Sequence, residues 1–185
     1  MFLRKKTAWQ IMTRYIAHRK DDLWKGAVAG AIGGLAGSGA MKLGQWALSP
    51  GKHNGLENSP QELREKTDED PTAQVATVLT EKVASIEPGP RAIKVGGALV
   101  HYAFGSGLGA VYGAVSELVP AARYAAGAPF GAAVWAAADL AAVPALGLSK
   151  PPNRIPVKQH VQMLGMHIAY GLATDTVRRY MRRAL

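Results

Sequence analysis

Long apolar blocks alternate with strongly polar ones along this chain of 185 residues. The clearest apolar block lies between Lys94 and Glu117, where no residue carries a full charge. A helix rises about 1.5 Å per residue, so this block is long enough to cross a bilayer. Similar blocks predict four helical spans, over residues 24–48, 94–119, 124–146 and 157–177. The fold class that we predict is all-α, an integral membrane four-helix bundle.

The polar segments predict what lies outside the membrane. Residues 1–23 predict a basic amphipathic helix on the membrane surface, ending where Asp21 or Asp22 caps the first span. Residues 49–93 predict an acidic, helical extramembrane loop with a capping-box helix over residues 59–66. A second helix is predicted after Asp70-Pro71, because apolar residues then recur at helical spacing. Residues 178–185 predict a basic C-terminal tail.

Glycine recurs at four-residue steps in three of the predicted spans. Residues four apart share a helix face, and a face without side chains lets another helix approach its backbone closely. We interpret these glycines as packing contacts within the chain, with a dimer interface or a pore lining as the alternatives. Proline is tolerated near the start of a helix, whereas Pro144 is predicted to kink or end the third span. The packing glycines are Gly26, Gly30, Gly34, Gly97, Gly105, Gly109, Gly113, Gly127 and Gly131.

A formal net charge of +9 raises the question of nucleic acid as a partner. The positive residues cluster near the two termini, beside apolar segments, and no nucleic-acid-binding motif accompanies them. The positive-inside rule explains this excess, so we expect a multi-pass protein with both termini in the cytoplasm and no nucleic-acid partner. The chain contains no cysteine, which excludes disulfides, thiolate metal sites and thiol catalysis.

Ionisable side chains inside spans are costly and usually face the interior of a bundle. Helix positions predict a polar cluster of His101, Asp139 and His167 in the outer half of the bundle, with His160 at its mouth. Three interpretations remain open. The cluster can be hydrogen-bonded packing, a pH-responsive group in which a carboxylate favours the charged imidazole, or a metal site. Near the inner surface, Glu117 and Arg123 are expected to form an ion pair.

The chain carries no signature of soluble-type catalysis. It has no nucleophile elbow, no HExxH zinc motif and no dinucleotide-binding fingerprint. We therefore expect no enzymatic activity, and we assign no catalytic residue, metal or cofactor.

Three glycine-rich segments resemble the YagU-like family of small bacterial inner-membrane proteins. They are KGAVAGAIGGLAGSGAMKLGQWAL, HYAFGSGLGAVYG and FGAAVWAAADLAAVPALGLSKPP, with a histidine-bearing span after them. The resemblance implies a location in the bacterial inner membrane and a molecular function that is largely undefined.

The function that we expect is that of a non-enzymatic structural or accessory protein of the inner membrane. Its partners are the lipid bilayer and either further copies of the chain or a larger membrane complex. The alternative is a small oligomeric transporter or channel that uses the His/Asp cluster.

Overall fold

The computed structural model describes residues 8–48, 70–84 and 89–185. All regular structure in these three ranges is helical, which confirms the all-α prediction. The predicted helix over residues 59–66, and the first seven residues, lie outside the described ranges. The elements are α1 (Ala8–Leu48), α3 (Pro71–Ala84), α4 (Pro90–Leu118), η1 (Pro120–Gly127), α5 (Ala128–Trp135), η2 (Ala136–Ala142), α6 (Val143–Ala145), η3 (Pro152–Arg154) and α7 (Val157–Ala184).

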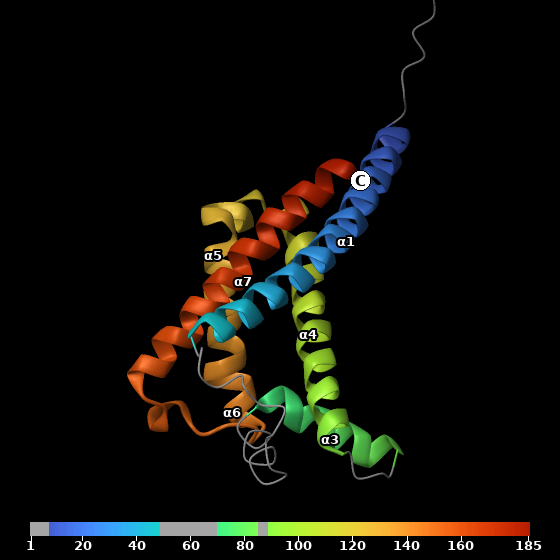
Figure 1. The fold of residues 1–185 in the computed structure, drawn as a ribbon. Helices are drawn as coiled ribbons and strands as arrows, with labels where there is room; N and C mark the ends of the chain where they lie inside the picture. The colour runs from blue at the N-terminus through green and yellow to red at the C-terminus, as the bar shows by residue number, and fades with distance from the viewer. Residues whose placement is uncertain (1–7, 49–69, 85–88) are drawn as a thin grey trace, which may run out of the picture.

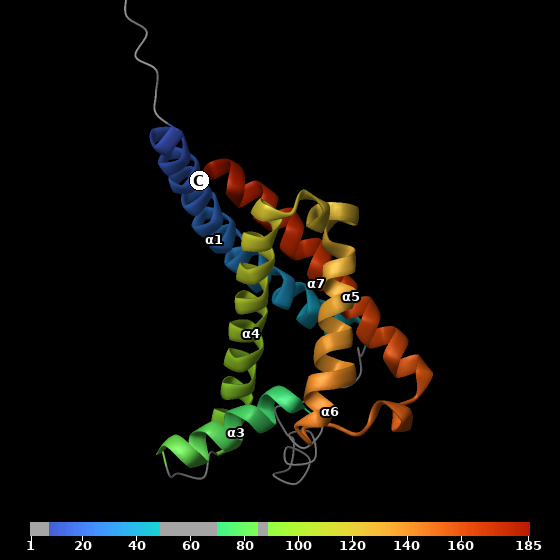
Figure 2. The ribbon, with the colours of Figure 1, turned by 180° about the vertical axis from the view of Figure 1, so that it is seen from behind.

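The long helices form two layers (Figures 1 and 2). α1 and α7 pack against each other and form one layer. α4 and α5 form the other layer, in which α4 packs on α1 and α5 packs on α7. Successive long helices run in opposite directions, so the C-terminus lies beside α1 at one end of the molecule and α3 lies at the other (Figure 1). α3 begins at Pro71, where a helix was predicted to start, and Asp70 Oδ1 accepts a hydrogen bond from the Thr72 backbone N–H at 2.9 Å.

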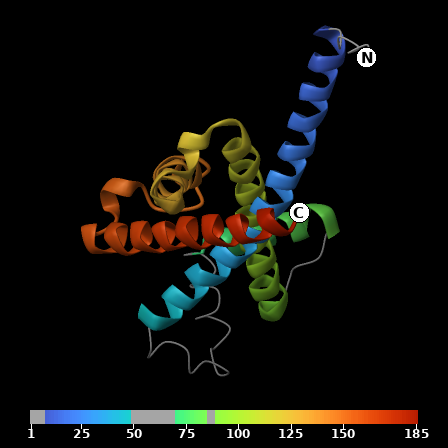
Figure 3. The same cartoon turned by 90° about the horizontal axis from the view of Figure 1, so that it is seen from above.

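α1 is one uninterrupted helix of 41 residues, about 60 Å long. The prediction of a separate surface helix ending at Asp21 or Asp22 is therefore wrong. Neither aspartate removes a backbone N–H or frees the backbone as proline or glycine would, so nothing there stops the helix. The N-terminal part of α1 consequently extends beyond the bundle, away from the C-terminus (Figure 3).

The regular α-helix of the third predicted span begins at Ala128, four residues after residue 124. The chain first passes through η1, where Ala125 and Ala126 have φ of 48° and 53° and Gly127 has φ of 84°. Left-handed backbone costs an alanine roughly 1–2 kcal/mol, because its Cβ crowds the following carbonyl. The turn into α5 is thus a strained left-handed one, and Pro129 is accommodated in the first turn of the helix.

α5, η2 and α6 follow one another as a single helical rod. The end of this rod agrees with the role predicted for Pro144. Proline has no N–H to donate, so the carbonyl of Leu140 loses its normal helical partner. Just before it the chain forms a π-helix, η2, in which the Val143 N–H reaches back five residues to Ala138. The helix ends at Ala145, and Gly147 follows with φ of 72°.

Within the described ranges, two helices are long and apolar enough to cross a membrane, Arg91–Leu118 and Ala121–Ala145. α1 and α7, which we also predicted to be spans, are long enough to cross a membrane but contain no stretch as apolar and as poor in charge as these two. The predicted basic tail over residues 178–185 is mostly helical, because α7 continues without a break to Ala184, and its boundary with the fourth span stays a prediction.

Candidate functional site

The glycines of α1 and α4 bring the two backbones into direct contact. A Cβ added to Gly30 would fall on the carbonyl oxygen of Gly109, and one added to Gly34 would fall on that of Gly105. A Cβ at Gly26 would lie 2.7 Å from the carbonyl oxygen of Gly113. Six of the predicted packing glycines therefore pair across one antiparallel contact made mainly of backbone, with the Ser38 and Glu117 side chains facing Gly105 and Gly26.

The remaining packing glycines meet other elements. Gly131 lies against the His167 backbone of α7, and Gly127 lies against Gly171 of the same helix. Gly97 instead faces Ala73 of α3, where an added Cβ would be 3.1 Å from the Ala73 Cα. The structure thus divides the predicted set among three interfaces: α1 with α4, α5 with α7, and α3 with α4.

A network of charged side chains joins α1, α4 and α7 near the C-terminus. Arg178 and Asp175 are both buried, and the Arg178 Nη2 donates to Asp175 Oδ1 at 2.8 Å. Arg179 forms a second ion pair with Asp175 Oδ2 at 2.6 Å. Arg182 bridges to the other helices by donating to Glu117 Oε1 at 3.1 Å and to Asp22. A buried charge is tolerated only with such compensation, so the network links the ends of three helices.

Aromatic rings lie directly beside the buried part of this network. The Arg178 guanidinium sits 5.7 Å from the centre of the Tyr112 ring, within the range of a cation–π contact. Tyr112 stacks on Phe130 of α5 with ring centres 4.3 Å apart. The Tyr170 hydroxyl donates to the carbonyl of Gly105 at 2.6 Å. The ring side chains therefore connect the ionic network to the glycine contact.

The predicted ion pair between Glu117 and Arg123 is not formed. Arg123 uses Nε and Nη2 to donate to the Ser116 carbonyl, at 2.9 and 2.6 Å. That carbonyl lies in the last turn of α4, where helix carbonyls lack intrahelical partners and attract cations. Glu117 pairs with Arg182 and, at 3.7 Å, with Arg178.

The predicted polar cluster is only partly assembled. Asp139 Oδ2 lies 3.7 Å from His167 Nδ1, and His160 is also close enough to interact electrostatically with Asp139. His101 forms no ion pair with Asp139 among the described residues, and its electrostatic neighbours are Lys42, Asp70 and His167. Among the described residues no group of three or more His, Asp or Glu is arranged to hold a metal ion, so the alternative of a metal site built from these four residues is not supported.

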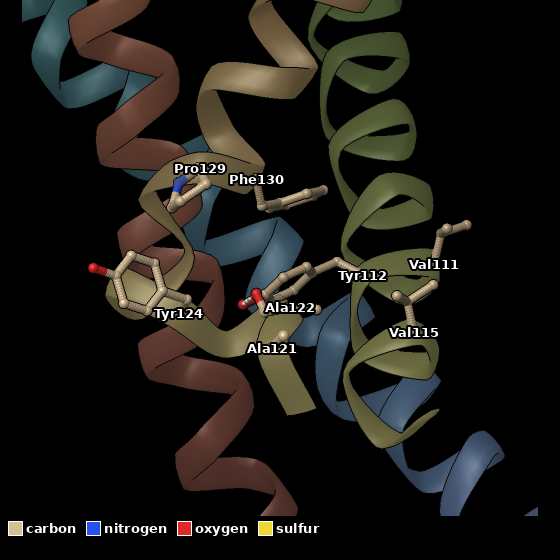
Figure 4. A pocket seen from close by; sticks show the side chains of 8 residues that line it. All are labelled: Val111, Tyr112, Val115, Ala121, Ala122, Tyr124, Pro129 and Phe130. Atoms are coloured by element: carbon tan, nitrogen blue, oxygen red, sulfur yellow. Dashed lines mark hydrogen bonds between the residues drawn. The ribbon is translucent and has the colours of Figure 1, made fainter. Parts of the chain in front are cut away.

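A shallow apolar groove of about 440 Å³ lies where α4, η1 and α5 meet (Figure 4). The stacked rings of Tyr112 and Phe130 lie within it, and the Tyr112 hydroxyl donates to the Ala122 carbonyl at 3.2 Å. The groove is lined by Val111, Tyr112, Val115, Ala121, Ala122, Tyr124, Pro129 and Phe130.

A family model described as "Protein of unknown function (DUF1440)" matches residues 38–176, which is well over half of the chain. The chain belongs to the DUF1440 family. No curated protein and no solved structure matches it. The DUF1440 match includes the glycines of α4 and the residues Asp139, His160, His167 and Asp175, and it ends before Arg178. The narrower resemblance to the YagU-like family stays a prediction.

The sequence interpretation missed the buried ionic network in this DUF1440 protein. From the sequence we predict a basic C-terminal tail over residues 178–185 and assign no role to Asp175. A signal was present, because Asp175, Arg178, Arg179 and Arg182 follow each other at steps of three, one and three residues. Such spacing places one acid and three bases on neighbouring positions of a single helix face.

Proposed function

We propose that this protein is an integral membrane protein with a structural or accessory role, built on helices that contact backbone to backbone. The observation that carries the proposal is the direct α1–α4 contact through six glycines. Contacts of this kind suit a bilayer, where lipid tails are as apolar as side chains and close packing drives association. In water the same glycines would lower helix stability.

The outer surface of the molecule supports membrane insertion. In the most apolar 18-residue stretch of each candidate span, only a small share is buried inside the protein. That share is 22 % for Arg91–Leu118 and 11 % for Ala121–Ala145. A core helix of a soluble protein would be mostly buried, whereas a lipid-facing helix exposes its apolar side chains. On α4, Val95, Leu99, Phe104 and Val111 are all more than half exposed.

The arrangement of the helices also supports four spans. α1 and α7 lie alongside the two candidate spans and have uncharged central stretches, residues 26–41 and 161–174. Their directions place the C-terminus and the ionic network at one end and the 146–156 connection at the other (Figure 1). With the positive-inside rule, we propose a multi-pass bacterial inner-membrane protein whose termini face the cytoplasm.

Labelling of single cysteines tests this topology, and the chain is suited to it because it has no cysteine. Asn153→Cys and Ala184→Cys introduce thiols at exposed positions of η3 and of the end of α7. In intact spheroplasts, an impermeant maleimide is expected to label Asn153→Cys and to leave Ala184→Cys unlabelled until the membrane is opened.

Ser38→Cys serves as the buried control, because Ser38 is 1 % exposed and should react only after denaturation. Equal labelling of the two exposed thiols from one side would contradict the topology. Recovery of the protein in the soluble fraction after carbonate washing would contradict membrane insertion altogether.

The accessory role is tested by mass determination after purification in mild detergent. We expect a particle larger than the 19.6 kDa chain and its detergent, containing either further copies or another membrane protein. A strictly monomeric particle that remains alone under gentle extraction would count against the accessory role.

A transporter or channel is the second candidate, favoured by one observation, the Asp139 carboxylate facing His167 from a π-helix. Such single-turn distortions occur often at functional sites. Ion flux into proteoliposomes that disappears in Asp139→Asn would favour this candidate over the accessory role.

A further inference from the structure

Three buried polar atoms lie on facing sides of the α5–η2 rod and α7 and have no hydrogen-bond partner. They are Trp135 Nε1, Asp139 Oδ2 and His160 Nδ1. The Trp135 and His160 rings meet edge to face with centres 6.1 Å apart, and His160 also interacts electrostatically with Asp139. A buried polar atom without a hydrogen-bond partner destabilises the folded protein, so three at one helix contact need an explanation.

The hydrogen bonds of the two histidines fix which ring nitrogens can accept a proton. His160 Nε2 lies 2.9 Å from the Pro152 carbonyl, and a carbonyl only accepts, so Nε2 must carry the hydrogen. In the neutral ring, Nδ1 of His160 therefore bears the lone pair. His167 is oriented the other way, because its Nδ1 donates to the Met163 carbonyl at 2.9 Å.

We propose that His160 Nδ1 and Asp139 Oδ2 form a proton-binding site that they share through one bound water. The water accepts a hydrogen bond from the Trp135 indole N–H and donates to the carboxylate and to His160 Nδ1. A buried water commonly makes about three hydrogen bonds of this kind to otherwise unpaired groups. Such a water satisfies all three orphan atoms at once.

Uptake of one proton from solution converts this arrangement to its charged form. The proton adds to the Nδ1 lone pair, and the resulting imidazolium donates to the water, which still donates to Asp139. The hydrogen bond between the water and Nδ1 thereby reverses, the water hydrogen that Nδ1 had accepted is released, and the carboxylate stabilises the new positive charge. Its Pro152 partner places His160 next to the connection between α6 and α7, so the proton arrives from that end of the molecule.

The other charged groups near the site are few. His167 approaches Asp139 from α7, and His101 on α4 interacts electrostatically with Lys42, Asp70 and His167. The neighbouring cations on the connection and on the first turn of α7 are exposed and screened by solvent, and they are Lys150, Arg154 and Lys158. The site uses only contacts among α5, η2, η3 and α7, so it does not depend on how many helices cross the bilayer.

Fluorescence of Trp135 tests the site, because a protonated imidazole next to an indole quenches its emission. The full chain in detergent carries Trp9→Phe, Trp24→Phe and Trp46→Phe, which leaves Trp135 as the single tryptophan. Emission is expected to fall in one step when the solution is acidified from neutral pH.

In that background, His160→Gln is expected to abolish the step. Asp139→Asn is expected to change the step, because the bound water loses its carboxylate acceptor. His101→Gln is the matched control and should leave the step in place. A step that persists in His160→Gln, or no step in a background that retains its helical circular dichroism, would overturn the proposal.

Nitrogen-15 NMR of histidine-labelled protein with all four tryptophans provides a readout that needs no substitution. At neutral pH the signal of His160 should be that of the ring protonated at Nε2 alone, changing to the doubly protonated ring on acidification. A ring protonated at Nδ1 at neutral pH, or one that never gains the second proton, would overturn the proposal even if the variants fail to fold.

Discussion

Gly109→Ala is expected to destabilise the protein strongly, although alanine is the better helix former. The added Cβ would fall on the carbonyl oxygen of Gly30 and lie 2.8 Å from the Gly34 Cα. These are backbone atoms, so the collision is relieved only by moving α1 away from α4. Overpacking of this kind costs about 1–3 kcal/mol, and we expect the upper end because no side chain can rotate aside. Unfolding of the detergent-solubilised protein, followed by circular dichroism, measures the change.

Gly107→Ala is the matched control on the same helix. A Cβ at Gly107 has no atom within 4 Å, so this variant receives the same gain in helix propensity, about 1 kcal/mol, without a collision. The difference between the two variants therefore isolates the helix contact. Equal stabilities would show that α1 and α4 do not touch at Gly109.

Arg178→Met is expected to lower the free energy of unfolding by about 3 kcal/mol. Removing one partner of a buried ion pair leaves the other charge without compensation, which typically costs about 3–5 kcal/mol. We expect the low end because Arg179 remains paired with Asp175 at 2.6 Å. Methionine keeps much of the side-chain volume, so the loss reports mainly on the charge. Thermal unfolding in detergent gives the comparison.

Two further variants separate the ion pair from a general effect of charge. Arg183→Met removes the same charge from an exposed position of α7 and should change stability by less than about 0.5 kcal/mol. The double variant Asp175→Leu with Arg178→Met removes both buried charges and should recover much of the loss. Additive losses in the double variant would contradict the assignment of the two residues as a coupled pair.

Hydropathy and helical spacing predicted the helical class and the positions of α4 and of the rod that begins with α5. These features depend on the local order of apolar and polar residues, which can be read from the sequence. The four-residue glycine spacing indicates a face suited to close contact, but it does not name the partner. The series on α4 meets α1 at Gly105, Gly109 and Gly113, yet Gly97 on the same helix meets α3.

Three features could not be obtained from local patterns. Gly127 suits the left-handed turn into α5, but the sequence gives no sign that Ala125 and Ala126 also adopt positive φ. Glu117 has a cation six residues away in Arg123, but its partner is Arg182, 65 residues further along the chain. Among several arginines, only the three-dimensional packing decides which one reaches a given carboxylate. The burial of Arg178 follows from the same packing.

The glycine contact also sets an order of events during synthesis. Gly26 and Gly113 meet in the folded protein but are more than 80 residues apart in the chain. At about 5–20 residues per second, a ribosome needs several seconds to make the intervening segment. Throughout that interval the glycine face of α1 has no α4 to pack against. When α4 has been made, its Glu117 still lacks the arginines of α7, which are synthesised later. Newly made chains therefore pass through a stage in which a chaperone or a neighbouring chain can bind the exposed glycine face of α1.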